Sequence, residues 1–276
     1  MRGRAIAGGS LLGLVALLAA GCASGARASR PEEDPSSLVI PPLGGDAATP
    51  AAPPTEPPRV RTALTIRARD PRIAARQPRS RALLMTEVKG LESLLAAAAP
   101  SSPDLPAIRR RLAESYNELA YTSSGPDAER ARDRVLEHYV AIAAEHPSYP
   151  AMDEIVYYQG LAYELNGDIT QARKSYLRLI TEHPRSKLVP LAYFAFGELF
   201  FAEAASDPTK NDLALQAFNQ VTRVAVADEP IRAEALLRTG ETLLRMGRDA
   251  EAGRTFEALR GGFPESDATA KIPDGY

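Results

Sequence analysis

The chain contains no tryptophan and a single cysteine, and none of its segments is rich in strand-forming residues. A lone cysteine excludes an internal disulfide, and the lack of strand-rich segments argues against a barrel or a sandwich. Neither sign of charge dominates, because 33 Lys and Arg stand against 35 Asp and Glu. A net charge this close to zero carries no electrostatic footprint of nucleic-acid binding, so we expect no nucleic-acid partner.

Motifs for catalysis and for cofactor binding are also missing. There is no glycine-rich loop for a phosphate and no nucleophile elbow. The three histidines, His138, His146 and His183, have no carboxylate or cysteine cluster at ligand spacing. His146 and His183 fall in the last turns of two predicted helices, where a partly protonated ring complements the helix dipole. We favour this structural interpretation over a metal or acid–base role, and predict no enzyme, no catalytic residue, no cofactor and no metal site.

Residues 1–21 have the pattern of a secretory signal, with two arginines at the start and an apolar core at 11–20. The core runs into Leu18-Ala19-Ala20-Gly21-Cys22, which resembles the lipobox of bacterial lipoproteins. The resemblance implies cleavage before Cys22 and attachment of acyl chains such as palmitate there. Because Ala23 follows instead of aspartate, it also implies transfer to the outer membrane. The alternative is an ordinary cleaved signal followed by a chance cysteine.

Residues 22–79 are predicted to be a disordered tether. Nine prolines and five acidic residues lie between Pro31 and Pro58, and such a composition cannot bury enough apolar surface to fold. The charge then reverses in the basic arm, residues 59–89, where nine Arg and Lys stand against Asp70 and Glu87. The arm could bind peptidoglycan or another anionic polymer, lipid headgroups or an acidic partner. The alternative is a solvated, mostly disordered run.

A helical hairpin recurs along the rest of the chain. Segment 153–186 holds two apolar runs at i, i+4, i+7 spacing, separated by the turn Asn166-Gly167-Asp168 and closed by Pro184. The small residues Gly160 and Ala172 are expected where the two helices cross. The same pattern recurs in segment 233–266, and looser copies occupy 104–149 and 190–230.

This unit resembles the tetratricopeptide repeat, a 34-residue helix–turn–helix. Glycine stands at its eighth position, alanine at the twentieth, an aromatic residue at the twenty-fourth and proline at the thirty-second. The usual tryptophan of the fourth position is replaced by Val156, Tyr193 and Leu236, and a large apolar side chain suffices there. The resemblance covers about residues 104–268.

The predicted fold class is all-α: a tetratricopeptide-like α-solenoid of stacked helical hairpins, preceded by a disordered tether. The predicted domains are a signal peptide (1–21), a lipidated tether (22–79) and the helical repeat domain (80–276). We expect the segment after Ser266 to be a ragged tail, because it is too short for another solvating helix.

The resemblance implies a concave groove lined by the first helix of each hairpin. Its wall is predicted to have aromatic residues and carboxylates but no lysine, which would suit an amphipathic, basic segment. The alternative is that the aromatic side chains are core residues between neighbouring repeats. The predicted partner-binding residues are Tyr157, Leu161, Glu164, Phe194, Glu198, Phe201 and Glu241.

The sequence thus favours an outer-membrane lipoprotein that faces the periplasm and acts as a protein–protein interaction scaffold in an envelope machine, for motility, secretion or barrel assembly. It is similar to repeat lipoproteins of the barrel-assembly machinery, to the repeat-bearing coordinator of the Tol-Pal system and to those of gliding and pilus machines. Its partners would be envelope proteins, through the groove, and the membrane, through the lipid on Cys22. The alternative is a cell-wall-binding accessory or coordinator of peptidoglycan enzymes that acts through the basic arm.

Overall fold

The computed structural model describes residues 69–72 and 79–276, and the predicted signal, lipobox and acidic tether lie outside these residues. All described residues belong to one compact unit, Ile40–Tyr276. The helices are α3 (Arg81–Ala97), α4 (Leu105–Thr122), α5 (Gly125–Glu145), α6 (Met152–Leu165), α7 (Ile169–Glu182), α8 (Val189–Glu203), α9 (Lys210–Arg223), α10 (Glu229–Arg245) and α11 (Asp249–Gly262), followed by the 3₁₀ turn η2 (Thr269–Lys271).

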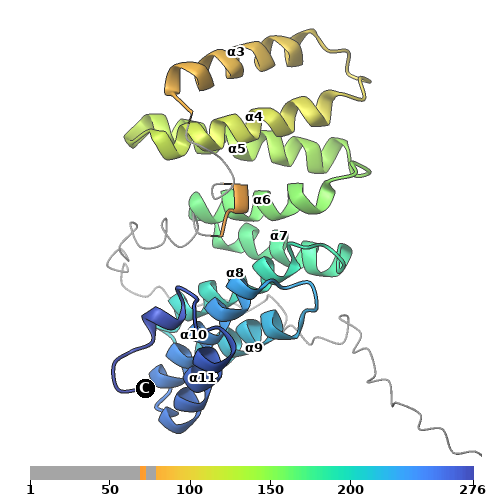
Figure 1. Cartoon of the computed structure of the whole chain (residues 1–276). Helices are drawn as coiled ribbons and strands as arrows, with labels where there is room; N and C mark the ends of the chain where they lie inside the picture. Colours follow the sequence, from red (N-terminus) through yellow and green to blue (C-terminus); the bar gives the residue numbers. More distant parts are fainter. Residues whose placement is uncertain (1–68, 73–78) are drawn as a thin grey trace, which may run out of the picture. The chain divides into compact units, whose positions relative to one another are not determined.

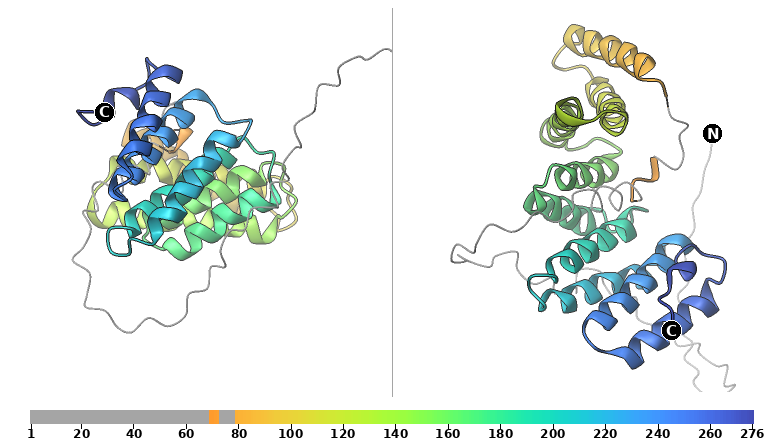
Figure 2. Two further views of the ribbon diagram at one scale, coloured as in Figure 1. Left: turned by 90° about the horizontal axis from the view of Figure 1, so that it is seen from below. Right: turned by 90° about the vertical axis from the view of Figure 1, so that its left-hand side faces the viewer.

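The helices form successive antiparallel hairpins that stack in chain order, from α3 at one end to α11 at the other (Figure 1). Each helix packs against the helix before it and the helix after it, and α8 also touches α10. The described residues contain no strand. The prediction of an all-α, tetratricopeptide-like solenoid is confirmed. The two further views show the same order of hairpins (Figure 2).

A glycine of the first helix faces an aromatic ring of the second helix in three hairpins. A Cβ atom at Gly160 would lie 2.6 Å from Cε1 of Tyr176, and one at Gly240 would lie 2.2 Å from Cε1 of Phe256. In the looser copy the same relation joins Gly197 to Phe218, at 2.3 Å. The glycines are therefore required because an aromatic ring fills the place of a side chain.

The turns of the two strict repeats share one backbone conformation. Gly167 and Gly247 have φ values of 80° and 71°, in the left-handed region that glycine adopts at little cost. After the first turn, the Asp168 carboxylate accepts a hydrogen bond from the Gln171 amide at 3.1 Å and caps α7.

The end of the chain is more ordered than the sequence suggested. Ala268 is buried, and the rings of Tyr276 and Phe256 meet edge to face with centroids 5.5 Å apart. Lys271 pairs with Glu234 of α10 at 3.3 Å. The expectation of a ragged tail after Ser266 was wrong, because Tyr276 covers the open end of the last hairpin core.

No helix among the described residues is long and apolar enough to cross a membrane.

Candidate binding site for an arginine-rich segment

A four-residue piece of the basic arm, Arg69–Arg72, packs against the first helices of the stack. The short segment lies beside α6 (Figure 1). Arg69 and Asp70 are both buried. The structure therefore differs from the expected tether at these residues, because their charged groups find partners on the helices. We call Arg69–Arg72 the arm segment.

The guanidinium of Arg69 pairs with the Glu164 carboxylate, and the two side chains are only 3% and 2% exposed. Arg69 binds Oε1 of Glu164, while the hydroxyl of Tyr176 donates to Oε2 at 2.8 Å. The hydroxyl of Tyr157 donates to the backbone carbonyl of Arg69 at 2.7 Å. The site therefore recognises both the charge of Arg69 and its main chain.

Arg72 and Asp70 form a second contact toward α4 and α5. Asp70 accepts two hydrogen bonds from the Arg72 guanidinium, at 2.8 and 2.7 Å, and one from the Asn117 amide at 3.2 Å. The other arm of the guanidinium donates to the Tyr139 hydroxyl at 2.5 Å. Arg72 also lies over the ring of Tyr158, with its Cζ atom 3.5 Å from the centroid, a cation–π geometry. We call the side chains of Asn117, Tyr139, Tyr157, Tyr158, Glu164 and Tyr176 the arm site.

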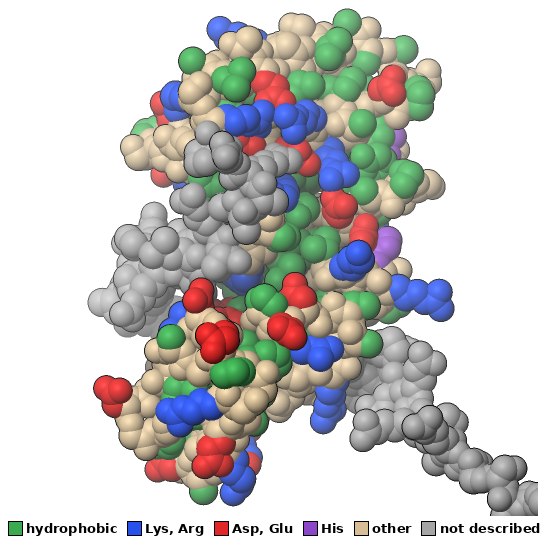
Figure 3. Space-filling view, viewed as in Figure 1, with side chains coloured by type: hydrophobic (Ala, Val, Ile, Leu, Met, Phe, Trp, Pro, Cys, Tyr) green, Lys and Arg blue, Asp and Glu red, His purple; other side chains and the backbone are tan. Residues whose placement is uncertain are grey.

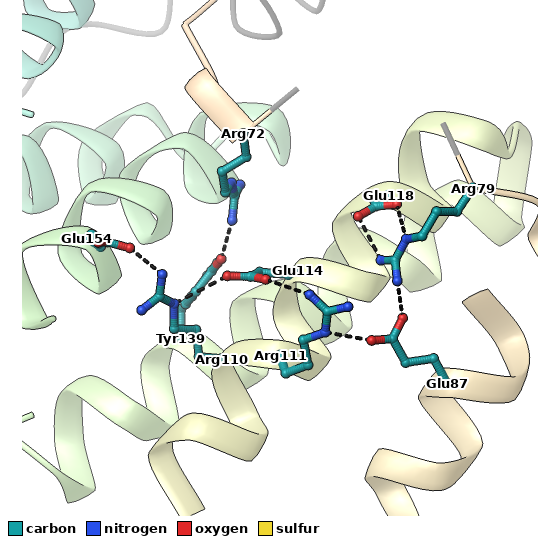
Figure 4. A network of polar contacts seen from close by, with 9 residues as sticks. All are labelled: Arg72, Arg79, Glu87, Arg110, Arg111, Glu114, Glu118, Tyr139 and Glu154. Atoms are coloured by element: carbon teal, nitrogen blue, oxygen red, sulfur yellow. Dashed lines mark hydrogen bonds and ion pairs between the residues drawn. The ribbon is translucent and has the colours of Figure 1, made fainter. Parts of the chain in front are cut away.

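A chain of ion pairs runs from α6 through α4 to α3. Figure 4 shows Arg110 between Glu154 and Glu114, and Arg111 between Glu114 and Glu87. Arg79 of the basic arm ends this chain, with Glu118 at 2.7 Å and with Glu87. The arm is therefore held on both sides of residues 73–78.

The electrostatics of the arm site favour a bound cation. Burial is the largest single effect and lowers the pKa of Arg69, but Glu164, Tyr176 and Tyr157 together outweigh it, and the pKa of Arg69 lies above its usual range. Burial raises the pKa of Tyr157 and Tyr176 well above the ordinary value, and the Glu164 charge acts in the same direction on both. These tyrosines therefore stay protonated and keep donating their hydrogen bonds at any physiological pH.

The predicted partner-binding residues separate into three groups. Tyr157 and Glu164 meet the arm segment, although Glu164 is buried and does not lie at a rim. Leu161 and Phe194 are buried, and Phe194 packs on Phe218 with ring centroids 5.4 Å apart. Phe194 is therefore in contact with the second helix of its own hairpin, as the core interpretation expects.

The remaining three predicted residues interact with arginines of α10. Arg238 pairs with Glu198 at 2.8 Å and with Glu241 at 2.7 Å. Phe201 is half-buried and lies under Arg245, whose Cζ atom is 3.5 Å from the ring centroid. Burial raises the pKa of Glu198, and Arg238 partly offsets the shift. We call Glu198, Phe201, Arg238, Glu241 and Arg245 the self-paired face.

Sequence reasoning missed Asn117, Tyr139, Tyr158 and Tyr176 of the arm site. Tyr139 and Tyr176 belong to second helices, which the predicted groove did not include, but their hydroxyls reach the first-helix side. The excess of arginine in the arm beside a repeat wall with carboxylates was the signal that could have joined the two regions.

Charges of both signs lie side by side on the face shown in Figure 3, so no one-sign field covers it. Within residues 69–72 and 79–276, no group of three or more His, Cys, Asp and Glu could hold a metal ion. His138 is buried against the Tyr116 ring, with centroids 5.9 Å apart.

Comparison with known families agrees with the fold. Residues 154–186 match one model of the tetratricopeptide repeat, and residues 201–267 match a second. No curated protein matches the chain. The two matches support a tetratricopeptide-repeat protein, a class whose members generally act as non-enzymatic scaffolds that bind other proteins.

Proposed function

We propose that the chain is a lipid-anchored scaffold of the outer membrane, which faces the periplasm and binds proteins of an envelope machine through its first helices. The observation that carries the scaffold role is that ion pairs join first helices of neighbouring hairpins, α4 to α6 and α8 to α10. Arg110 of α4 binds Glu154 of α6 at 2.5 Å, and Arg238 of α10 binds Glu198 of α8. A surface held together in this way can present one extended binding face.

The lipid anchor is supported by the sequence alone. The lipobox-like run before Cys22 lies after a charged start and an apolar core, and Cys22 is the only cysteine in the chain. Two or three acyl chains on this residue hold a protein stably at a membrane. The proline-rich segment that follows gives the helical repeats reach away from the lipid.

The anchor is tested by labelling cells with radioactive palmitate and separating their membranes. We expect the wild-type chain to carry label and to fractionate with the outer membrane, and the Cys22→Ala variant to lose both. Outer-membrane recovery of unlabelled Cys22→Ala protein would contradict the anchor. Crosslinking in the native envelope, followed by identification of the captured protein, then tests the scaffold role and chooses among motility, secretion and barrel-assembly machines.

The alternative, a cell-wall-binding accessory, relies on a free basic arm. Arg69, Arg72 and Arg79 are instead paired with carboxylates of the chain itself. A peptidoglycan pull-down with the full chain and with an Arg69→Ala/Arg72→Ala/Arg79→Ala variant distinguishes the two functions. Loss of peptidoglycan binding in the variant alone would favour the alternative.

A further inference from the structure

We propose that the arm site is a recognition site for a short segment of a partner protein that carries two arginines three residues apart, with an acidic residue after the first. In this proposal the arm segment, Arg69-Asp70-Pro71-Arg72, fills the site in cis, and the partner binds by displacing it. The proposal deepens the scaffold function above and depends on it for the identity of the partner, but not for the existence of the site.

The first argument is that the arm site lacks a cation of its own. Among the described ion pairs, Glu164 is joined only to Arg69, which is not part of the helices. Tyr176 orients the Glu164 carboxylate from the adjacent helix. Without the arm segment, the helices would therefore present a fixed, half-satisfied carboxylate, and such a group strongly favours an incoming guanidinium.

The second argument is that the contacts recognise a particular spacing of groups along one short segment, in which Pro71 and Arg72 are helical. Tyr157 binds the main-chain carbonyl of Arg69, which every residue type offers, while Glu164 selects the side chain. Tyr139 and the Tyr158 ring then select a second guanidinium three residues later. Asp70 fits between the two arginines because Arg72 and Asn117 both donate to it. A partner segment needs these same groups at the same spacing.

The third argument is that the arm segment fits imperfectly, so a better ligand can replace it. Nε and Nη1 of Arg69 are buried and have no hydrogen-bond partner among the described groups. Buried donors left unpaired weaken the bound state. A partner segment that also places a hydrogen-bond acceptor against these two nitrogens would bind more tightly than the arm segment does.

Because the arm segment occupies the arm site, a partner must bind tightly enough to displace it. Residues 73–78 connect the arm segment to Arg79, which is fixed by Glu118. A short tether gives an effective concentration on the order of millimolar. If the same segment bound with a Kd of about 100 μM, its tethered copy would weaken the apparent affinity of a free ligand about tenfold.

The experiment measures binding of a fluorescent peptide with the sequence of residues 66–75 to the full chain purified in detergent. We expect the Arg69→Ala/Arg72→Ala chain to bind the peptide about tenfold or more tightly than the wild-type chain does. The matched control, Arg81→Ala/Arg130→Ala, removes two arginines that pair with the exposed Asp127 and should behave as wild type. A peptide with both arginines replaced by alanine should bind neither chain.

We call the Arg69→Ala/Arg72→Ala variant the arm-released chain. Adding Glu164→Gln to it should abolish peptide binding, and adding Tyr157→Phe should weaken it. Tyr157→Phe keeps the ring, so it tests the site even if Glu164→Gln does not fold. Equal affinity of the wild-type and arm-released chains, or no binding to either, would overturn the proposal. A wild-type dimer by light scattering that dissociates on Arg69→Ala/Arg72→Ala would also overturn it, because the arm would then bind a second copy. These results are independent of palmitate labelling and membrane fractionation.

Discussion

The carboxylates of the arm site and of the self-paired face lie on first helices in both regions, but they are neutralised in different ways. On α8 and α10, the carboxylates of Glu198 and Glu241 are neutralised by Arg238, within the repeats themselves. On α6, the carboxylate of Glu164 is neutralised by Arg69, from outside the repeats. A carboxylate that is neutralised by an arginine of the repeats stabilises the stack. A carboxylate that is neutralised by an arginine of a separable segment makes a binding site.

The largest expected effect concerns what both regions share, the close contact of glycine and aromatic ring. Gly160→Leu beneath the arm site and Gly240→Leu beneath the self-paired face should each cost ~1–3 kcal/mol or more through overpacking. Ala172→Leu, at a fully buried position of α7, should act in the same direction. Thermal unfolding by circular dichroism measures the loss. Gly90→Leu is the control, because a Cβ atom there meets nothing within 4 Å. Unchanged midpoints would contradict the packing.

The difference between the two regions is tested most directly by removing one arginine from each. Arg238→Ala leaves Glu198 and Glu241 without their partner, and we expect the free energy of unfolding to fall by ~1–3 kcal/mol. Arg69→Ala should cost the repeats less, because the arm segment can leave and water can then reach Glu164. Chemical denaturation of the two variants gives both values. A larger loss for Arg69→Ala would mean that the arm segment is part of the core.

Substitutions that remove a single hydrogen bond test individual contacts between the arm site and the arm segment. Tyr157→Phe removes the hydrogen bond to the Arg69 carbonyl, and Asn117→Ala removes the one to Asp70. Each should weaken docking of the arm segment by ~0.5–1.5 kcal/mol. Hydrogen exchange of residues 66–79 should become faster in both variants, while exchange in α6 and α7 stays the same. Tyr193→Phe on α8 serves as the control, and equally fast exchange in that variant would contradict a specific contact.

The smallest effect is a pH dependence that comes from His138 of α5. Burial lowers the pKa of His138 to about 4, and the charge of Arg134 contributes. An unfolded histidine titrates near ~6.5. Between these values the unfolded chain binds a proton that the folded chain does not, so stability falls as the pH drops from about 6.5 to about 4. Melting midpoints of wild type and His138→Leu should differ in slope across this window. Parallel slopes would contradict the assignment.

Much of the fold could be predicted from the sequence because key positions of the repeat tolerate few residue types. Gly160 and Gly240 admit no side chain beneath Tyr176 and Phe256, and their spacing to the closing prolines marks the hairpins. The end of the chain could not be predicted in this way. Tyr276 is ordered by its contact with Phe256. A local sequence pattern does not predict a contact between two residues this far apart in the chain.

The candidate site was predictable only in part. The first-helix positions of Tyr157 and Glu164 follow from the repeat, and so does their place on one face. The opposite charges of the arm and the repeat wall could indicate a contact, but not that residues 69–72 make it, because an arginine-rich run looks the same whether it is solvated or paired. The pairing depends on Tyr176 of α7 placing the Glu164 carboxylate, which is a tertiary contact.

The most direct test of the arm site uses the absence of tryptophan from the chain. Tyr158→Trp places a single indole beneath the Arg72 guanidinium, and acrylamide quenching of its fluorescence then reports whether the arm segment covers it. We predict weak quenching in the otherwise wild-type chain and stronger quenching when Arg69→Ala is added, because loss of the anchor at Glu164 releases Arg72 as well. Equal quenching in the two chains, with equal melting midpoints, would contradict the account.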